Sequence, residues 1–160
     1  MTRPPELREL AQLLRLRTLR AAAAARDCVR CAREVEDAEA ALARRDVRIA
    51  HWLEERAELA RFIVGEGARD LARFAPSTAA RRAHLAEQHE RDAYARLDDL
   101  RALEQARGRL AAAQARRARE QAREDETRQM LRQAAGAALA RRDTVDAGDA
   151  PPALRAVAWS

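Results

Sequence analysis

The sequence predicts an all-α protein in which two long helices form one antiparallel coiled-coil hairpin. Three features lead to this prediction. Apolar residues follow a heptad pattern over residues 7–63, a glycine-containing break follows, and a second charged, alanine-rich segment of similar length occupies residues 78–142. Charged residues make up 36% of the 160 residues and aromatic residues only 3%, which is typical of long helices and not of a globular core.

The first helix is expected to run from about residue 5 to residue 64. Pro4 and Pro5 suit a first helical turn, and Gly65 or Gly67 should end the helix by adopting the left-handed conformation. Fourteen of its eighteen a and d sites are apolar, where a hydrophobic content of 48% would give about nine. The a sites are Leu7, Leu14, Ala21, Cys28, Val35, Leu42, Ile49, Arg56 and Ile63, and the d sites are Leu10, Arg17, Ala24, Cys31, Ala38, Arg45, Trp52, Leu59 and Glu66.

The connection between the helices is expected at residues 65–77. Pro76 marks the approach to the second helix, which we expect over about 78–142 with Ser77 or Thr78 as its cap. The predicted seam of this helix is poorer and divides into two registers. One contains Ala79, Ala83, Ala86, Ala93, Leu97 and Leu100, and the other contains Leu103, Ala106, Leu110 and Ala113. The three-residue step between them predicts a stammer.

Equal helix lengths predict the pairing register. If the chain turns near residue 70, residue i faces roughly residue 141 − i. The expected neighbours are Leu10 with Leu131, Cys31 with Leu110, Trp52 with His89, and Arg17 with Glu124 or Asp125. Residues 143–160 lose the periodicity and contain Pro151-Pro152, so we expect a disordered tail with a small apolar group at Leu154, Val157 and Trp159.

Charge and hydropathy predict a cytoplasmic, soluble protein. The net charge is +5, from 31 cations and 26 anions whose signs are interleaved as on a solvated helix surface. No apolar run approaches the ~20 residues that span a bilayer. The N-terminus has no signal-peptide core, and two cysteines fit a reducing compartment.

The residues that could carry chemistry favour a structural interpretation. Cys28 and Cys31 have the spacing of a metal or redox motif, but no second ligand pair is present and both fall on a and d sites, so small packing residues explain them better. His84 and His89 are five apart and do not share a helical face. We therefore expect no enzyme activity, no catalytic residue, no cofactor and no metal site.

The exposed tip of the hairpin is a candidate docking surface. Phe62, Leu71 and Phe74 cluster around the predicted turn in a chain with very few aromatic residues. Aromatic side chains are favoured at binding hot spots. The alternative is that these three residues only stabilise the turn.

From Leu7 to Arg142 the chain resembles the FliJ/YscO family, the stalk proteins of flagellar and injectisome type III secretion. The resemblance rests on size, helix lengths and an Ala/Arg/Glu/Gln-rich heptad pattern, without a diagnostic motif. It implies a non-enzymatic stalk that links a hexameric secretion ATPase to the cytoplasmic ring of the export gate, peripheral to the inner membrane, and that can bind export chaperones. The tip would face the gate, and the open end would enter the ATPase ring through Leu7, Leu10, Leu14, Arg128, Leu131 and Arg132.

Two other functions fit the same pattern. A generic structural coiled coil or adaptor would use the same seam, in a homodimer or with a partner helix, whereas the stalk is expected to be a monomer or to self-associate weakly. A nucleic-acid-binding hairpin would use the arginines of the second helix. The modest net charge, the interleaved acids and the scarcity of stacking aromatics argue against nucleic acid.

Overall fold

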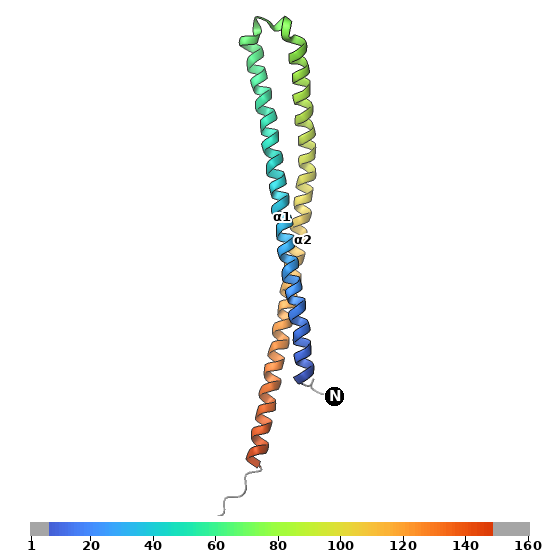
Figure 1. Cartoon of the computed structure of the whole chain (residues 1–160), viewed down its shortest axis with the longest axis vertical. Helices are drawn as coiled ribbons and strands as arrows, with labels where there is room; N and C mark the ends of the chain where they lie inside the picture. The colour runs from blue at the N-terminus through green and yellow to red at the C-terminus, as the bar shows by residue number, and fades with distance from the viewer. Residues whose placement is uncertain (1–6, 149–160) are drawn as a thin grey trace, which may run out of the picture. The chain divides into compact units, whose positions relative to one another are not determined.

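The computed structural model describes residues 7–148, without the side chains of Leu71 and of residues 145–148. It contains the long helix α1 (Leu7–Val64), the short 3-10 helix η1 (Glu66–Ala68) and the long helix α2 (Leu71–Gly148) (Figure 1). The predicted all-α fold of two long helices joined by a short connection is confirmed.

Contacts divide the chain into two compact units, and both long helices contribute to each. The turn unit comprises residues 26–115 and contains η1. The terminal unit comprises residues 1–25 and 116–160. In each unit the segment from α1 lies antiparallel to the segment from α2, because η1 reverses the direction of the chain (Figure 1).

Burial along α1 follows the predicted heptad seam. In the terminal unit the buried residues of α1 are Leu10, Ala21 and Ala24, and in the turn unit they are Cys28 and Cys31. All five occupy a or d sites. These sites repeat on one side of a helix, so the apolar period alone was sufficient to identify the side that faces α2.

The pairing register also agrees with the prediction. For each ion pair or hydrogen bond between the helices of the turn unit, we added the two residue numbers. The sums lie between 136, for Arg81 with Glu55, and 146, for Arg107 with Glu39. In the terminal unit Thr18 pairs with Glu124, and their numbers add up to 142. The expected value was 141, so the predicted turn near residue 70 was a sound guide to the register, although α2, with 78 residues, is longer than α1, with 58.

The end of α1 lies where the glycines predicted it, but the mechanism differs. The helix ends at Val64, and the Gly65 N–H donates to the Arg61 carbonyl at 2.9 Å. Gly65 has a φ of −98°, and no glycine in the described part of the chain has a positive φ, so the expected left-handed closure was wrong. Gly67 is needed for space, because a Cβ there would lie 2.7 Å from Cε1 of Phe62.

Helix α2 begins at Leu71, earlier than the predicted residue 78. The carbonyl of Asp70 accepts hydrogen bonds from the N–H groups of Arg73 at 2.9 Å and Phe74 at 3.2 Å, which starts the helix before Pro76. Pro76 is the sixth residue of the helix, so it lies inside α2 and cannot donate a hydrogen bond to the Ala72 carbonyl. The connection is therefore shorter than the predicted residues 65–77.

Ser77 and Thr78 do not cap α2. Their hydroxyls donate to the Phe74 carbonyl at 2.9 and 3.0 Å, and Thr78 also lies 3.1 Å from the Ala75 carbonyl. An N-cap side chain accepts from backbone N–H groups, whereas these hydroxyls donate to carbonyls one turn back. Both residues therefore lie inside the helix.

The far end of α2 extends past the predicted boundary at residue 142. The helix continues to Gly148, so residues 143–148, assigned to a disordered tail, are helical. The remainder of that predicted tail, with Leu154, Val157 and Trp159, lies outside the described residues. By the register above, Leu7 faces about residue 134, so the last turns of α2 run beyond the start of α1 (Figure 1).

The seam of α2 in the turn unit agrees with the second predicted register, in which Leu103, Ala106 and Ala113 are buried and Leu110 is half-buried, and differs from the first. Residues at a constant spacing of seven face α1, and they include two aspartates: Leu85, Asp92, Asp99, Ala106 and Ala113. The residues of the first predicted register are largely exposed, including Ala79, Ala83, Ala86 and Leu97. A spacing of seven leaves no stammer, so that prediction was wrong. It failed because polar residues occupy part of the true seam.

Candidate partner-binding site

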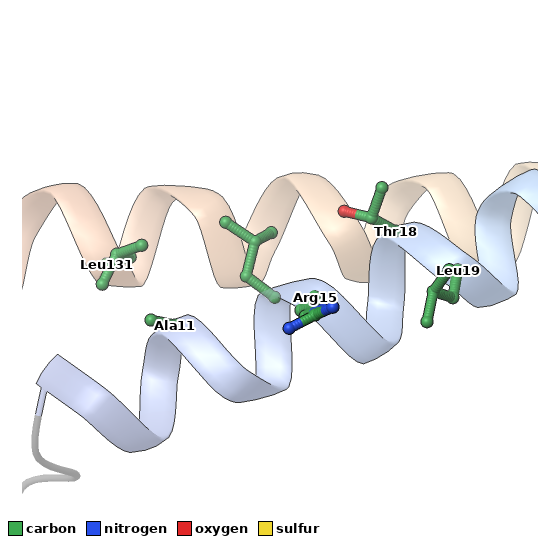
Figure 2. Close-up of a pocket in the computed structure, with 6 residues that line it drawn as sticks. Ala11, Arg15, Thr18, Leu19 and Leu131 are labelled. Atoms are coloured by element: carbon green, nitrogen blue, oxygen red, sulfur yellow. The ribbon is translucent and has the colours of Figure 1, made fainter.

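The terminal unit contains an apolar groove between the two helices. Its volume is about 370 Å³, and Figure 2 shows Ala11, Arg15, Thr18 and Leu19 along α1 with Leu131 opposite on α2. Leu14 completes the lining. Leu14 and Leu131 are half-buried, while Leu19 is 60% exposed at the rim. Because α1 supplies leucines on more than one side, pairing with α2 leaves part of this apolar surface uncovered.

The six residues predicted to bind a partner at the open end have different environments. Leu14 and Leu131 both line the groove, and Leu7 is 40% exposed. Leu10 is only 3% exposed, so its side chain packs between the helices and offers no surface. Arg128 is held by Glu124 and Asp125, whereas Arg132 is exposed and lies outside the groove lining.

Glu124 lies in the seam of the terminal unit. Its carboxylate accepts from the Thr18 hydroxyl at 3.1 Å and from the Arg128 guanidinium. Arg17 was expected to pair with Glu124 or Asp125, and that prediction was wrong. The Nε of Arg17 is buried without a hydrogen-bond partner, and so is Oε2 of Glu120. The terminal unit therefore contains a seam arginine whose burial is not compensated.

Exposed leucines extend around α1 beyond the groove. Leu13 is 38% exposed and Leu16 is 55% exposed. Neither is an a or d residue, so neither contributes to the seam with α2. A helix that is apolar on several sides is normally covered on several sides. Leu13 and Leu16 therefore form apolar surface that α2 does not cover.

The two units differ in charge balance. The turn unit has 17 arginines and 17 acidic residues, while the terminal unit has 14 arginines and 9 acidic residues, so the whole net charge of +5 belongs to the terminal unit. Ion pairs connect the helices of the turn unit in several places: Arg81 with Glu55, Arg96 with Asp46, Arg107 with Glu39, and Arg109 with Glu34. In the terminal unit the described arginines of α1 have no ion pair: Arg8, Arg15, Arg17 and Arg20. The same holds for four arginines of α1 in the turn unit: Arg26, Arg33, Arg44 and Arg56.

A polar network crosses the seam of the turn unit. Arg45 donates from Nη1 to Asp92 Oδ1 at 2.8 Å and from Nε to Asp99 Oδ2 at 2.9 Å. Trp52 donates from Nε1 to Asp92 Oδ2 at 2.8 Å. Trp52 was expected near His89, but its indole partner is one turn further along α2. Asp92 is only 9% exposed, so this carboxylate is buried with its hydrogen bonds made.

The network shifts the pKa values of Asp92 and Arg45. The hydrogen bond from Trp52 lowers the pKa of Asp92, and hydrogen bonds and charge from Arg45 and charge from Arg48 act in the same direction against the effect of burial. Hydrogen bonds to Asp99 and Asp92 raise the pKa of Arg45. The group is therefore an ionised carboxylate and guanidinium in the seam, an arrangement that favours one register of the two helices over others.

A sequence signal for this network existed. Arg45 occupies a d site, where a cation needs an anion, and the register places it opposite residue 96. Asp92 and Asp99 lie about one helical turn to either side of that residue. Reading apolar residues alone assigned both aspartates to the solvent-facing surface.

The cysteines pack in the core of the turn unit. Cys28 and Cys31 are buried and free, and they form a cluster with Ala113 against which Leu110 packs. The predicted contact of Leu110 with the cysteines is confirmed. Small side chains at these sites allow the two helices to approach closely.

The tip of the turn unit carries a pair of aromatic rings. Phe62 and Phe74 meet edge to face with their centroids 6.5 Å apart, and the Arg73 guanidinium lies 5.8 Å from the Phe74 ring centre. Their exposed fractions are 41% and 38%. The third predicted residue, Leu71, has a side chain outside the described part of the structure. The two phenylalanines thus stabilise the turn and present a surface at the same time.

Within residues 7–148, no group of three or more histidine, cysteine or acidic side chains could hold a metal ion. None of the described helices is long and apolar enough to cross a membrane. No protein family model, no curated protein and no solved structure matches this chain.

Proposed function

We propose that this chain is the non-enzymatic central stalk of a type III secretion export apparatus, linking a hexameric secretion ATPase to the export gate. The observation that supports this most is the difference between the units. The turn unit has no net charge and several ion pairs between its helices, whereas the terminal unit carries the net charge of +5 and has an apolar groove beside arginines of α1 that have no ion pair. A stalk needs such a division between a self-supporting part and a part that engages partners.

The turn unit supports this role through its seam. Arg45, Asp92 and Trp52 hold α1 and α2 in one register, and the ion pairs on the surface add further links. Each exposed pair contributes little alone, but the half-buried network is better shielded from water and salt. Two helices locked in this way transmit a displacement of one end to the other without sliding past each other.

The terminal unit supplies the contacts expected of a helix pair inside a ring. Leu7, Leu14 and Leu131 offer apolar surface, and Arg132 offers an exposed cation. In this role the ATPase subunits would contact the pair transiently, so moderate apolar areas and exposed charges suit it better than a large continuous interface. The stalk works in the cytoplasm at the base of the apparatus, peripheral to the inner membrane.

The tip is assigned to the export gate. Phe62 and Phe74 form a compact, half-exposed aromatic pair at the turn, which is a favourable anchor for a small docking interface. Export chaperones are further candidate partners of either end.

Reconstitution with the secretion ATPase encoded in the same genome tests this function. Adding the full chain should increase ATP hydrolysis and hexamer formation, and the two proteins should migrate together on a sizing column. Replacing Leu14 by aspartate should weaken these effects, whereas Leu53→Asp, at a 48% exposed position in the turn unit, should not. Unchanged hydrolysis and assembly together with separate migration would reject the stalk.

A homodimeric coiled-coil adaptor is the second candidate. The exposed Leu13 and Leu16 favour it, because a second helix pair could cover them. Sedimentation equilibrium distinguishes the two functions. A stable dimer that becomes monomeric when Leu16 is replaced by aspartate would favour the adaptor. A monomer at micromolar concentration would favour the stalk.

A further inference from the structure

We propose that the groove of the terminal unit binds an acidic amphipathic helix from a partner protein. The groove consists of Ala11, Leu14, Arg15, Thr18 and Leu19 of α1 with Leu131 of α2 (Figure 2). This proposal concerns the chemical class of the partner, and it does not require the partner to be a secretion ATPase.

The shape of the groove fits a third helix. It lies between two antiparallel helices, with the small Ala11 beside the half-buried Leu14 and Leu131. An apolar side chain from a neighbouring helix inserts into such a space between four residues, as a knob enters a hole in a coiled coil. Leu19, 60% exposed, continues the apolar surface by one turn and provides a second contact at helical spacing.

Charge identifies the partner as acidic. Arg15 lines the groove and has no anionic partner in the described structure, and the terminal unit carries the entire net charge of +5. A second copy of this chain would bring an identical excess of arginine to the same place. A helix with leucines on one side and glutamates beside them covers the groove and pairs with Arg15, whereas a basic helix would be repelled.

An anionic membrane is the competing occupant, because leucine and arginine also favour an interface with acidic lipids. The geometry favours a helix. The apolar groove is a concave space between α1 and α2, and Leu10, Ala21 and Ala24 of α1 are already buried against α2. A membrane-surface helix buries a convex apolar side, whereas Leu14 and Leu131 here line a space between two helices.

Fluorescence anisotropy with the full chain tests the proposal. The probe is a labelled designed peptide of three heptads, with leucine at a and d and glutamate at most other sites. A second peptide carries lysine in place of glutamate. We expect the acidic peptide to bind, the basic peptide to bind at least about tenfold more weakly, and the affinity for the acidic peptide to fall as salt is added.

Two variants at exposed positions locate the site without disturbing the seam. Leu19→Asp and Arg15→Glu should each weaken binding of the acidic peptide about tenfold, and Arg15→Glu should improve binding of the basic peptide. The matched controls in the turn unit are Leu53→Asp and Arg91→Glu, both exposed, and both should bind like the unmodified chain.

Three results would overturn the proposal. The first is no binding of the acidic peptide, and the second is binding that the control variants weaken as much as Leu19→Asp does. The third is binding of phosphatidylserine vesicles that depends on Leu19 and Arg15 and that the acidic peptide does not reduce. Failure of the ATPase reconstitution with retained peptide binding would reject the stalk function while leaving this site in place.

Discussion

Trp52 of α1 and Asp92 of α2 are joined by a hydrogen bond of 2.8 Å between the indole Nε1 and the carboxylate Oδ2. The second oxygen of Asp92 accepts from Arg45 at 2.8 Å, so one buried carboxylate connects two residues of the opposite helix. These two residues are seven apart and occupy successive d sites. A slip of α1 by one heptad would bring Arg45 to the site of Trp52, or Trp52 to the site of Arg45, so Asp92 would keep only one of its two donors. Both hydrogen bonds are made together in only one register of the turn unit.

Replacing Trp52 by phenylalanine should destabilise the turn unit by about 1–3 kcal/mol, because an ionised acceptor loses one hydrogen bond while most of the apolar contact remains. Urea unfolding followed by circular dichroism measures the change. Leu53→Ala is the control, since this 48% exposed side chain should alter stability by about 0.5 kcal/mol or less. Equal effects of the two substitutions would contradict a role for the indole hydrogen bond.

The same carboxylate predicts a dependence of stability on pH. The pKa of folded Asp92 lies below its ordinary value of 3.8, so the unfolded chain binds the proton more readily. Its stabilising contribution is therefore complete above that value and is lost as the pH falls through the lower folded pKa. Arg45, whose pKa is raised by its hydrogen bonds to Asp99 and Asp92, remains charged throughout this window.

Comparison with Asp92→Asn isolates this contribution from those of other carboxylates. The difference in the free energy of unfolding between the original chain and Asp92→Asn should be constant near neutral pH and should shrink as the pH is lowered from about 4 toward 2. A difference that does not change with pH would show that Asp92 does not gain its stabilisation from the ionised form.

The sequence predicted the helices, the register and the seam of α1 because each depends on apolar period or chain length. It predicted the part of the α2 seam at residues 103–113 but missed the polar seam positions, where Asp92, Asp99, Glu124 and Thr127 face α1. A search for apolar residues treats such positions as solvated. The pairing could be recognised only after the register had been combined with the charge of Arg45.

The boundaries were missed for a different reason. A proline marks a helix start in many sequences, but Pro76 lies in the second turn of α2, inside the helix. The groove could not be predicted at all, although Leu14 and Leu131 were identified. The groove depends on the distance between the two helices, which decides how much of Ala11 and Leu19 stays uncovered. The heptad pattern does not give that distance.

The two arginines at d sites predict opposite effects of substitution. Arg17 has a buried Nε without a partner, so Arg17→Met should raise the free energy of unfolding by about 1–2 kcal/mol through removal of an unpaired donor and gain of apolar contact. Arg45→Met should lower it, because Asp92 and Asp99 would lose their cation. Denaturant unfolding of both variants measures the sign. A stabilising effect of Arg45→Met would show that the network does not contribute to stability.

The glycines provide a test of the turn. A Cβ at Gly67 would lie 2.7 Å from the Phe62 ring and 3.0 Å from the Phe62 carbonyl oxygen, so Gly67→Ala must displace the ring or the backbone. We expect the free energy of unfolding to fall by about 1–3 kcal/mol and the packing of Phe62 against Phe74 to change.

Gly108 in α2 is the matched control, because a Cβ there meets nothing within 4 Å. Gly108→Ala should stabilise the helix by about 0.5–1 kcal/mol. Thermal unfolding of the two variants measures these changes, and nuclear magnetic resonance of the Phe62 and Phe74 rings reports on the tip. If Gly67→Ala were as stabilising as Gly108→Ala and left the ring signals unchanged, Phe62 would not cover the turn.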